Sequence, residues 1–96
     1  MQFVVHGEWS SGTAPPEEVQ AGLAAALRPG DESVAVWISP EDPQVLMVGF
    51  DVEADSYEAA LDAGRTELLE AGRATPGSSL ARVTAMTEDG YRTWSP

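Results

Sequence analysis

Hydrophobic and polar residues alternate along four short segments of the chain, a pattern that is typical of half-buried β-strands. The predicted strands are residues 2–9, 33–39, 44–53 and 80–87. In the first of them, Phe3, Val5 and Trp9 point to one side, whereas Val4 and His6 point to the other. The alternation therefore assigns each strand residue to one of two sheet faces.

Two further segments repeat apolar residues every three or four positions, which predicts two amphipathic helices. The first helix opens at Pro15 and Pro16, because proline fits a first helical turn. Pro29 and Gly30 stop it, so that Arg28 is expected in its last turn. Its apolar stripe consists of Val19, Leu23, Ala26 and Leu27. This stripe predicts that one side of the helix packs against the sheet.

The second and longest predicted helix starts after Asp55, whose spacing to Glu58 resembles a capping box, and extends to about Arg73. Its inward stripe consists of Tyr57, Leu61, Gly64, Leu68 and Ala71. Glycine in this stripe costs the helix about 1 kcal/mol relative to alanine. We therefore expect Gly64 to lie where the helix approaches the sheet closely.

The order of these elements is β-α-β-β-α-β, which resembles the ferredoxin-like plait. That α+β fold has a four-stranded antiparallel sheet in the order 4-1-3-2, with both helices on one face. We expect residues 1–96 to form a single domain, because the chain is shorter than the usual length of about 100 to 200 residues per domain. After a turn at Asp89 and Gly90, the C-terminal tail, residues 90–96, forms either a short fifth strand or an extended segment.

One face of such a sheet stays uncovered, and we refer to it as the open face. The residues assigned to it are Val4, His6, Ala35, Trp37, Val45, Met47, Arg82, Thr84 and Met86. Several of these side chains are apolar, whereas an exposed sheet face usually carries Thr, Glu, Lys and Gln. A contiguous apolar patch of this kind marks an interface or a ligand site. In one alternative, a strand is shifted in register; in another, the tail, Tyr91 to Trp94, folds back over this face.

The leading hypothesis is a small, acidic, soluble binding or regulatory module that acts through the open face. We expect a second copy in a homodimer, or another protein, to cover that face. The candidate interface residues are Val4, His6, Trp37, Val45, Met47, Thr84 and Met86.

Composition narrows the classes of partner. The chain has 16 acidic and 5 basic residues, a net charge of -11 and no cysteine. So few scattered arginines argue against binding to nucleic acids or to anionic membrane surfaces. The lack of cysteine removes disulfides, thiolate metal ligands and thiol nucleophiles. No signal peptide or membrane span is visible, so we expect a cytoplasmic protein.

Catalytic chemistry has only weak candidates. His6 is the one histidine, and histidine is the side chain suited to proton transfer near neutral pH, but no nucleophile is placed beside it by spacing. Tyr57 is the second candidate. In length and topology the chain is similar to the dimeric α+β barrel proteins, which include cofactor-independent monooxygenases with a cavity between the helices and the sheet. A small enzyme of that kind is therefore the alternative hypothesis.

No cofactor or metal site is predicted. Asp51, Glu53 and Asp55 have spacings that could hold a hard cation, but Asp55 is assigned to the helix cap and the rest of a Ca²⁺ loop is missing. Gly7 and Gly12 have the spacing of a phosphate-binding loop without its lysine. The first pattern is interpreted as a solvated acidic strand end and the second as a coincidence of spacing.

Overall fold

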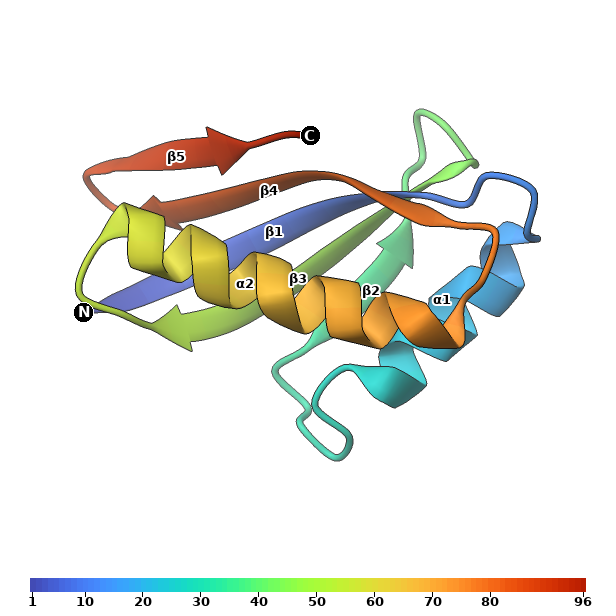
Figure 1. The fold of residues 1–96 in the computed structure, drawn as a ribbon, viewed down its shortest axis with the longest axis horizontal. Coiled ribbons are helices and arrows are strands. Elements are labelled where there is room, and N and C mark those ends of the chain that lie inside the picture. The colour runs from blue at the N-terminus through green and yellow to red at the C-terminus, as the bar shows by residue number, and fades with distance from the viewer.

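The computed structural model describes residues 1–96 and contains five strands, two α-helices and one short 3₁₀ helix (Figure 1). In chain order the elements are β1 (Gln2–Ser10), α1 (Pro16–Ala26), β2 (Ala35–Ile38), β3 (Val45–Glu53), α2 (Tyr57–Ala71), η1 (Gly72–Ala74), β4 (Ser79–Thr87) and β5 (Gly90–Trp94). Every strand and helix expected from the sequence is present, although several of them begin or end at different residues.

The five strands form one antiparallel sheet in the order β2-β3-β1-β4-β5. β1 is the central strand, and its residue His6 pairs with Gly49 of β3 and Thr84 of β4. The tail forms the fifth strand, in which Tyr91 pairs with Met86. The alternative in which this tail folds back over the open face is therefore wrong, because β5 extends the sheet sideways.

Both helices pack on the same side of the sheet (Figure 1). The buried apolar residues between them and the strands are Phe3, Val5, Trp9, Val19, Leu23, Leu27, Leu46, Val48, Phe50, Val52, Ala60, Leu68, Ala71, Leu80, Val83 and Ala85. Alternate residues of β1 and β3 supply seven of these sixteen core residues, as the period of two in their sequences requires. Trp9 is buried to 2% exposure, and its indole nitrogen Nε1 donates a hydrogen bond to Ser78 Oγ at 2.8 Å.

Gly64 lies where α2 comes closest to β1. A Cβ atom built on Gly64 would lie 2.7 Å from Cγ1 of Val5, a residue with no exposed surface. No carbon–carbon contact is stable at that distance, so a side chain here would have to push the helix or the valine aside. The prediction of a close approach at Gly64 is confirmed.

The first helix ends earlier than expected. α1 stops at Ala26, Leu27 has an extended backbone, and Arg28 adopts a positive φ of 44°. The placement of Arg28 in the last helical turn was wrong, because a residue before proline is disfavoured in the α-helical region and Pro29 follows it. Leu27 is nevertheless buried as the stripe predicted.

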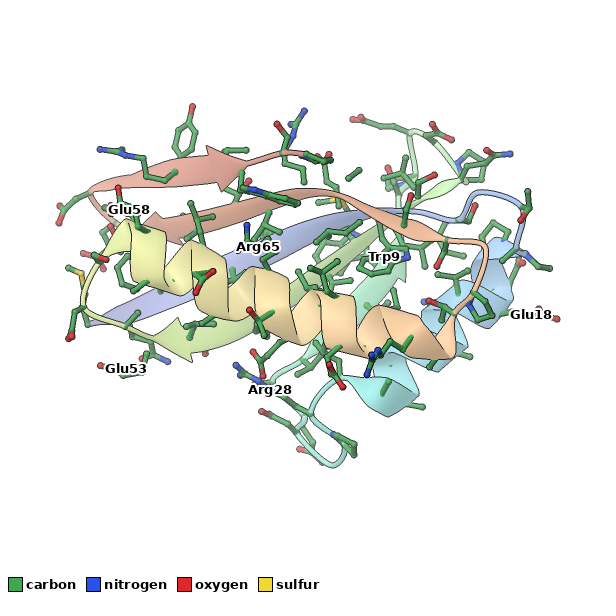
Figure 2. All side chains as sticks on the ribbon, in the orientation of Figure 1. Trp9, Glu18, Arg28, Glu53, Glu58 and Arg65 are labelled. Carbon is green, nitrogen blue, oxygen red and sulfur yellow. The ribbon has the colours of Figure 1, made fainter.

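Arg28 joins three elements from this unusual backbone position (Figure 2). Its guanidinium donates to both carboxylate oxygens of Glu67 on α2, at 2.9 and 2.7 Å, and to the carbonyl oxygen of Asp51 on β3, at 2.7 Å. The same group lies 4.7 Å from the ring centroid of Phe50. Arg28 thus fastens the α1–β2 connection to α2 and to the part of β3 that β2 is too short to cover.

The start of the second helix also differs from the expectation. Ser56, not Asp55, is the N-cap, and its hydroxyl oxygen accepts a hydrogen bond from the backbone nitrogen of Ala59 at 3.1 Å. α2 ends at Ala71, and the segment that contains Arg73 continues as η1. A single hydroxyl with the correct spacing to Ala59 is a sufficient cap, so Asp55 is left outside the helix.

Replacing Gly64 with alanine is expected to destabilise the protein, although alanine is the better helix former. Overpacking against Val5 costs about 1–3 kcal/mol, whereas the gain in helix propensity is about 1 kcal/mol. We expect the free energy of unfolding in urea to fall by about 1 kcal/mol. Combining Gly64→Ala with Val5→Ala should cost less than the sum of the two single changes, because the smaller residue makes room. Additive effects would contradict the contact.

Substitutions at Arg28 separate its side-chain contacts from its backbone conformation. Arg28→Ala removes the bonds to Glu67 and Asp51 but retains a left-handed backbone, and should lower the free energy of unfolding by about 1–2 kcal/mol, given partial solvent screening. Arg28→Gly loses the same contacts, yet should be about 1 kcal/mol more stable than the alanine variant because glycine adopts a positive φ without strain. Equal stabilities of the two variants by chemical denaturation would argue against the strained backbone.

Candidate functional site

The open face is built from alternate residues of all five strands, which the pairing aligns in three rows across the sheet. The middle row consists of Ala35, Gly49, His6, Thr84 and Thr93. On one side of it runs a row of Trp37, Met47, Glu8 and Arg82. On the other side runs a row of Asp51, Val4, Met86 and Tyr91. Apart from His6 the middle row has small side chains, so the larger side chains of the flanking rows project further from the sheet.

His6 occupies the centre of this face. It is the middle residue of the central strand, and its imidazole meets the ring of Trp37 edge to face, with centroids 6.1 Å apart. Both rings lean over Gly49, where an added Cβ atom would lie 3.3 Å from Cδ2 of His6 and 3.7 Å from Cζ3 of Trp37. Gly49 therefore provides the space in which the two rings meet.

All seven candidate interface residues lie on this one face. The register places Trp37 beside Met47, Val4 beside Met86 and His6 beside Thr84, and Val45 lies at the end of the face opposite Ser10. Trp37 is 38% exposed and Val4 is 41% exposed, whereas the two methionines and His6 are half-buried. The alternative of a shifted register is therefore wrong.

β5 adds two residues to the face that were not among the candidates. Tyr91, with 65% of its surface exposed, extends the row of Val4 and Met86, and Thr93 extends the middle row. The hydroxyl groups of Thr93 and Thr84 are 3.3 Å apart. The segment after the Asp89 turn was predicted as a possible short strand, but it was too short for the sequence to predict the register of these residues.

Few charged groups belong to the face. Arg82 and Glu8 form a loose ion pair, with Nε and Oε2 3.7 Å apart and the Arg82 side chain 53% exposed. Asp51 lies on the other flank of the sheet, where its carboxylate has no salt-bridge partner within the chain. A hollow of about 710 Å³ adjoins Asp51, Val4 and Met86. Its rim also carries Glu88 and Asp89, so this end of the face is acidic.

The two weak catalytic candidates are not brought together. His6 is on the open face, whereas Tyr57 starts α2 on the other side of the sheet. The Tyr57 hydroxyl lies 2.7 Å from Thr87 Oγ1, and its ring packs edge-on against Phe3 with centroids 5.1 Å apart. The sheet therefore lies between His6 and Tyr57, as the alternation of their elements predicted.

The space between the helices and the sheet, where the monooxygenase-like alternative requires a ligand cavity, is occupied by side chains. Phe3, Val5, Leu23, Leu46 and Leu68 have no exposed surface and belong to one contiguous cluster. The buried polar residues are Ser11 and Thr75, which lie at the loop end of the molecule, and no buried side-chain nitrogen or oxygen lacks a hydrogen-bond partner. This interior offers no converging polar groups to a substrate.

Arg28 and Asp31, which have shifted pKa values, lie away from the open face. Hydrogen bonds to the Glu67 carboxylate raise the pKa of Arg28, against the opposing effect of its partial burial. Hydrogen bonds from the hydroxyl and the backbone nitrogen of Ser33 lower the pKa of Asp31. Both groups stabilise the connection from α1 to β2, which is a structural role.

No cluster of three or more His, Cys, Asp or Glu residues is arranged to hold a metal ion, and neither helix is long and apolar enough to cross a membrane. Figure 2 shows Glu18, Glu53 and Glu58 at the periphery of the molecule, pointing away from one another. Asp51, Glu53 and Asp55, whose spacing alone could hold a hard cation, likewise form no such cluster. No protein-family model, curated protein or solved structure matches the chain.

Proposed function

We propose that this chain is a small binding or regulatory module that acts through the open face of its sheet. We further propose that its scaffold is a ferredoxin-like plait with one added strand. The strand order supports this assignment, because β2-β3-β1-β4 is the order 4-1-3-2 read from the opposite edge, and β5 adds to the β4 edge. The helices then occupy one face, and the opposite face becomes the working surface.

The observation that carries this proposal is the apolar and aromatic character of the open face. Trp37, Val4 and Tyr91 expose between 38% and 65% of their surface, and half-buried Met47 and Met86 lie between them in the same two rows. A sheet face that contacts only water is usually polar, because each exposed apolar side chain retains an unfavourable hydration free energy. Aromatic residues and methionine are also the types enriched in the cores of protein interfaces.

The distribution of charge supports the same surface. Only three of the sixteen acidic residues lie on strands, namely Glu8, Asp51 and Glu53. The others lie in helices and connections, where they repel anionic surfaces and keep other contacts weak. The single arginine of the face, Arg82, is already near Glu8, so a polyanion finds no basic patch there. The partner that fits is the apolar surface of a protein, and we expect the contact to form in the cytoplasm.

A photo-crosslinking residue tests the surface without knowledge of the partner. Benzoylphenylalanine in place of Tyr91 places the probe on the open face, and the same residue in place of Leu69, which is 51% exposed on α2, is the matched control. We expect crosslinked products in cells at residue 91 and few at residue 69. Adding Trp37→Asp should remove the products at residue 91, because a buried carboxylate opposes association.

Products of equal yield at residues 91 and 69, or products at residue 91 that survive Trp37→Asp, would contradict the proposal. Far-ultraviolet circular dichroism and thermal unfolding of each variant check that the fold is unchanged. Trp37 is on the sheet surface and is not part of the core between helices and sheet, so the aspartate variant should still fold.

A further inference from the structure

We infer that the occupant of the open face is a second copy of this chain, placed by a two-fold axis that brings Arg82 of each copy beside Asp51 of the other. This inference rests on the proposed function and names its partner. It is supported by the area of the face, by the position of His6 and by the placement of its charged and aromatic side chains.

The area of the face matches what a stable dimer requires only if the whole face is covered. Three strands have nine residues, and the edge strands have four and five. At about 3.3 Å per residue and about 4.8 Å between strands, the sheet projects roughly 600 Å². Side chains that stand out from the sheet increase the accessible area toward the roughly 800 Å² per partner of a standard interface. A copy shifted to one side would bury much less, so the symmetry axis must pass near the centre of the face.

His6 marks that centre. β1 is the third of five strands in the sheet, and His6 has four residues of β1 on either side of it. A two-fold contact is made by the same patch on both copies, so the residue at its centre faces its own counterpart. The two imidazoles therefore meet, and each is already held by Trp37 on its own chain.

Arg82 and Asp51 occupy opposite positions about His6. Arg82 pairs with Glu8, two residues along β1 in one direction, and Asp51 pairs with Val4, two residues along β1 in the other. The first lies on β4 and the second on β3, on opposite sides of β1. A two-fold axis through His6, in the plane of the interface and perpendicular to the line that joins these residues, exchanges them. Each Arg82 then meets a carboxylate that forms no salt bridge in its own chain, and each acidic flank of the face receives a cation.

The same axis follows a diagonal of aromatic residues. On a flat grid with the strand spacings given above, Trp37, His6 and Tyr91 lie on one line through the centre, and this line coincides with the axis. Each aromatic ring therefore packs against its own counterpart in the second copy. The strands of the two sheets cross at about 70°, close to the orthogonal class of sheet packing.

Other small residues of the middle row receive the methionines in this arrangement, because the space over Gly49 is already filled by His6 and Trp37 of the same chain. Met47 of one copy projects over Ala35 of the other, and Met86 projects over Thr84 and Thr93. Large side chains thus oppose small ones on both sides of the axis, as close packing between two sheets requires. A face that carries rows of large and rows of small side chains can therefore pack closely against a second copy of itself.

A charge swap tests the exchange of Arg82 and Asp51. We expect Arg82→Glu and Asp51→Arg each to raise the dimer dissociation constant about tenfold or more, because each change creates two contacts between like charges across the interface. The double variant should return to within about threefold of the wild type. Analytical ultracentrifugation at low salt measures the constants. Arg73→Glu, on η1 away from the face, changes the net charge by the same amount as Arg82→Glu and should have little effect.

Recovery in the double variant can only come from contacts between copies. Within one chain the two side chains are about 16 Å apart on the sheet, from the strand spacings, which exceeds the screening length of about 8–10 Å. Thermal unfolding of each variant shows whether Asp51→Arg disturbs Arg28 nearby. If Asp51→Arg disturbs Arg28, the neutral variants Asp51→Asn and Arg82→Gln replace the two charge-reversing variants. Each neutral variant should also weaken the dimer.

A protein that stays monomeric at about 100 μM, or a double variant that remains as weak as the single ones, would overturn this inference. The proposed function would survive either result if residue 91 still crosslinks to other proteins and Trp37→Asp removes those products. A dimer that Trp37→Asp leaves unchanged would overturn this inference as well, because that dimer uses a different surface. Absence of specific products at residue 91 in the protein that retains Trp37 would instead overturn the proposed function.

Discussion

Contact between two helices and a single face of the sheet is the physical constraint on which the rest of this structure depends. α2 approaches β1 so closely at Gly64 that the methyl groups of Val5 fill the space a side chain would need. Leu23 and Leu68, one from each helix, are completely buried in the same core. The apolar stripes of both helices pack against this side of the sheet. The chain has no further helix with which to cover the other face. The apolar residues of that face are therefore either covered by another molecule or exposed to water.

The two faces, and therefore most of the candidate surface, could be predicted because a strand alternates with a period of two. Val4 and Val5 are both valines, yet one is 41% exposed and the other has no exposed surface, and only their position in the pattern distinguishes them. The same pattern already assigned His6 and Tyr57 to opposite sides of the sheet. Local chemistry was less predictable. The end of α1 depends on the restriction that Pro29 imposes on Arg28, and the start of α2 depends on whether Ser56 or Asp55 reaches the backbone of Ala59.

The register between neighbouring strands could not be obtained from the sequence, because it depends on contacts between residues that are far apart in the chain. The positions of Arg82 and Asp51 on opposite sides of His6 are of this kind, since they follow from two separate strand pairings, β1 with β3 and β1 with β4. Tyr91 is another example, because its place in the face depends on the pairing of β5 with Met86. Arg28 is the clearest case. Its bonds to Glu67 and Asp51 join residues 39 and 23 positions away, and no local pattern signals them.

The short edge strands have a consequence for how this protein avoids aggregation. β2 has four residues and is followed by Pro40 and Pro43, and β5 has five residues and ends two positions before Pro96. Proline lacks the backbone N–H that strand pairing needs, so these residues limit the extension of both edge strands past their C-terminal ends. Along the exposed part of β3, Arg28 occupies the carbonyl oxygen of Asp51. Growth by edge-to-edge pairing into fibrils is thus limited on both sides of the sheet, while its open face remains accessible, and a two-fold contact through that face forms a closed pair.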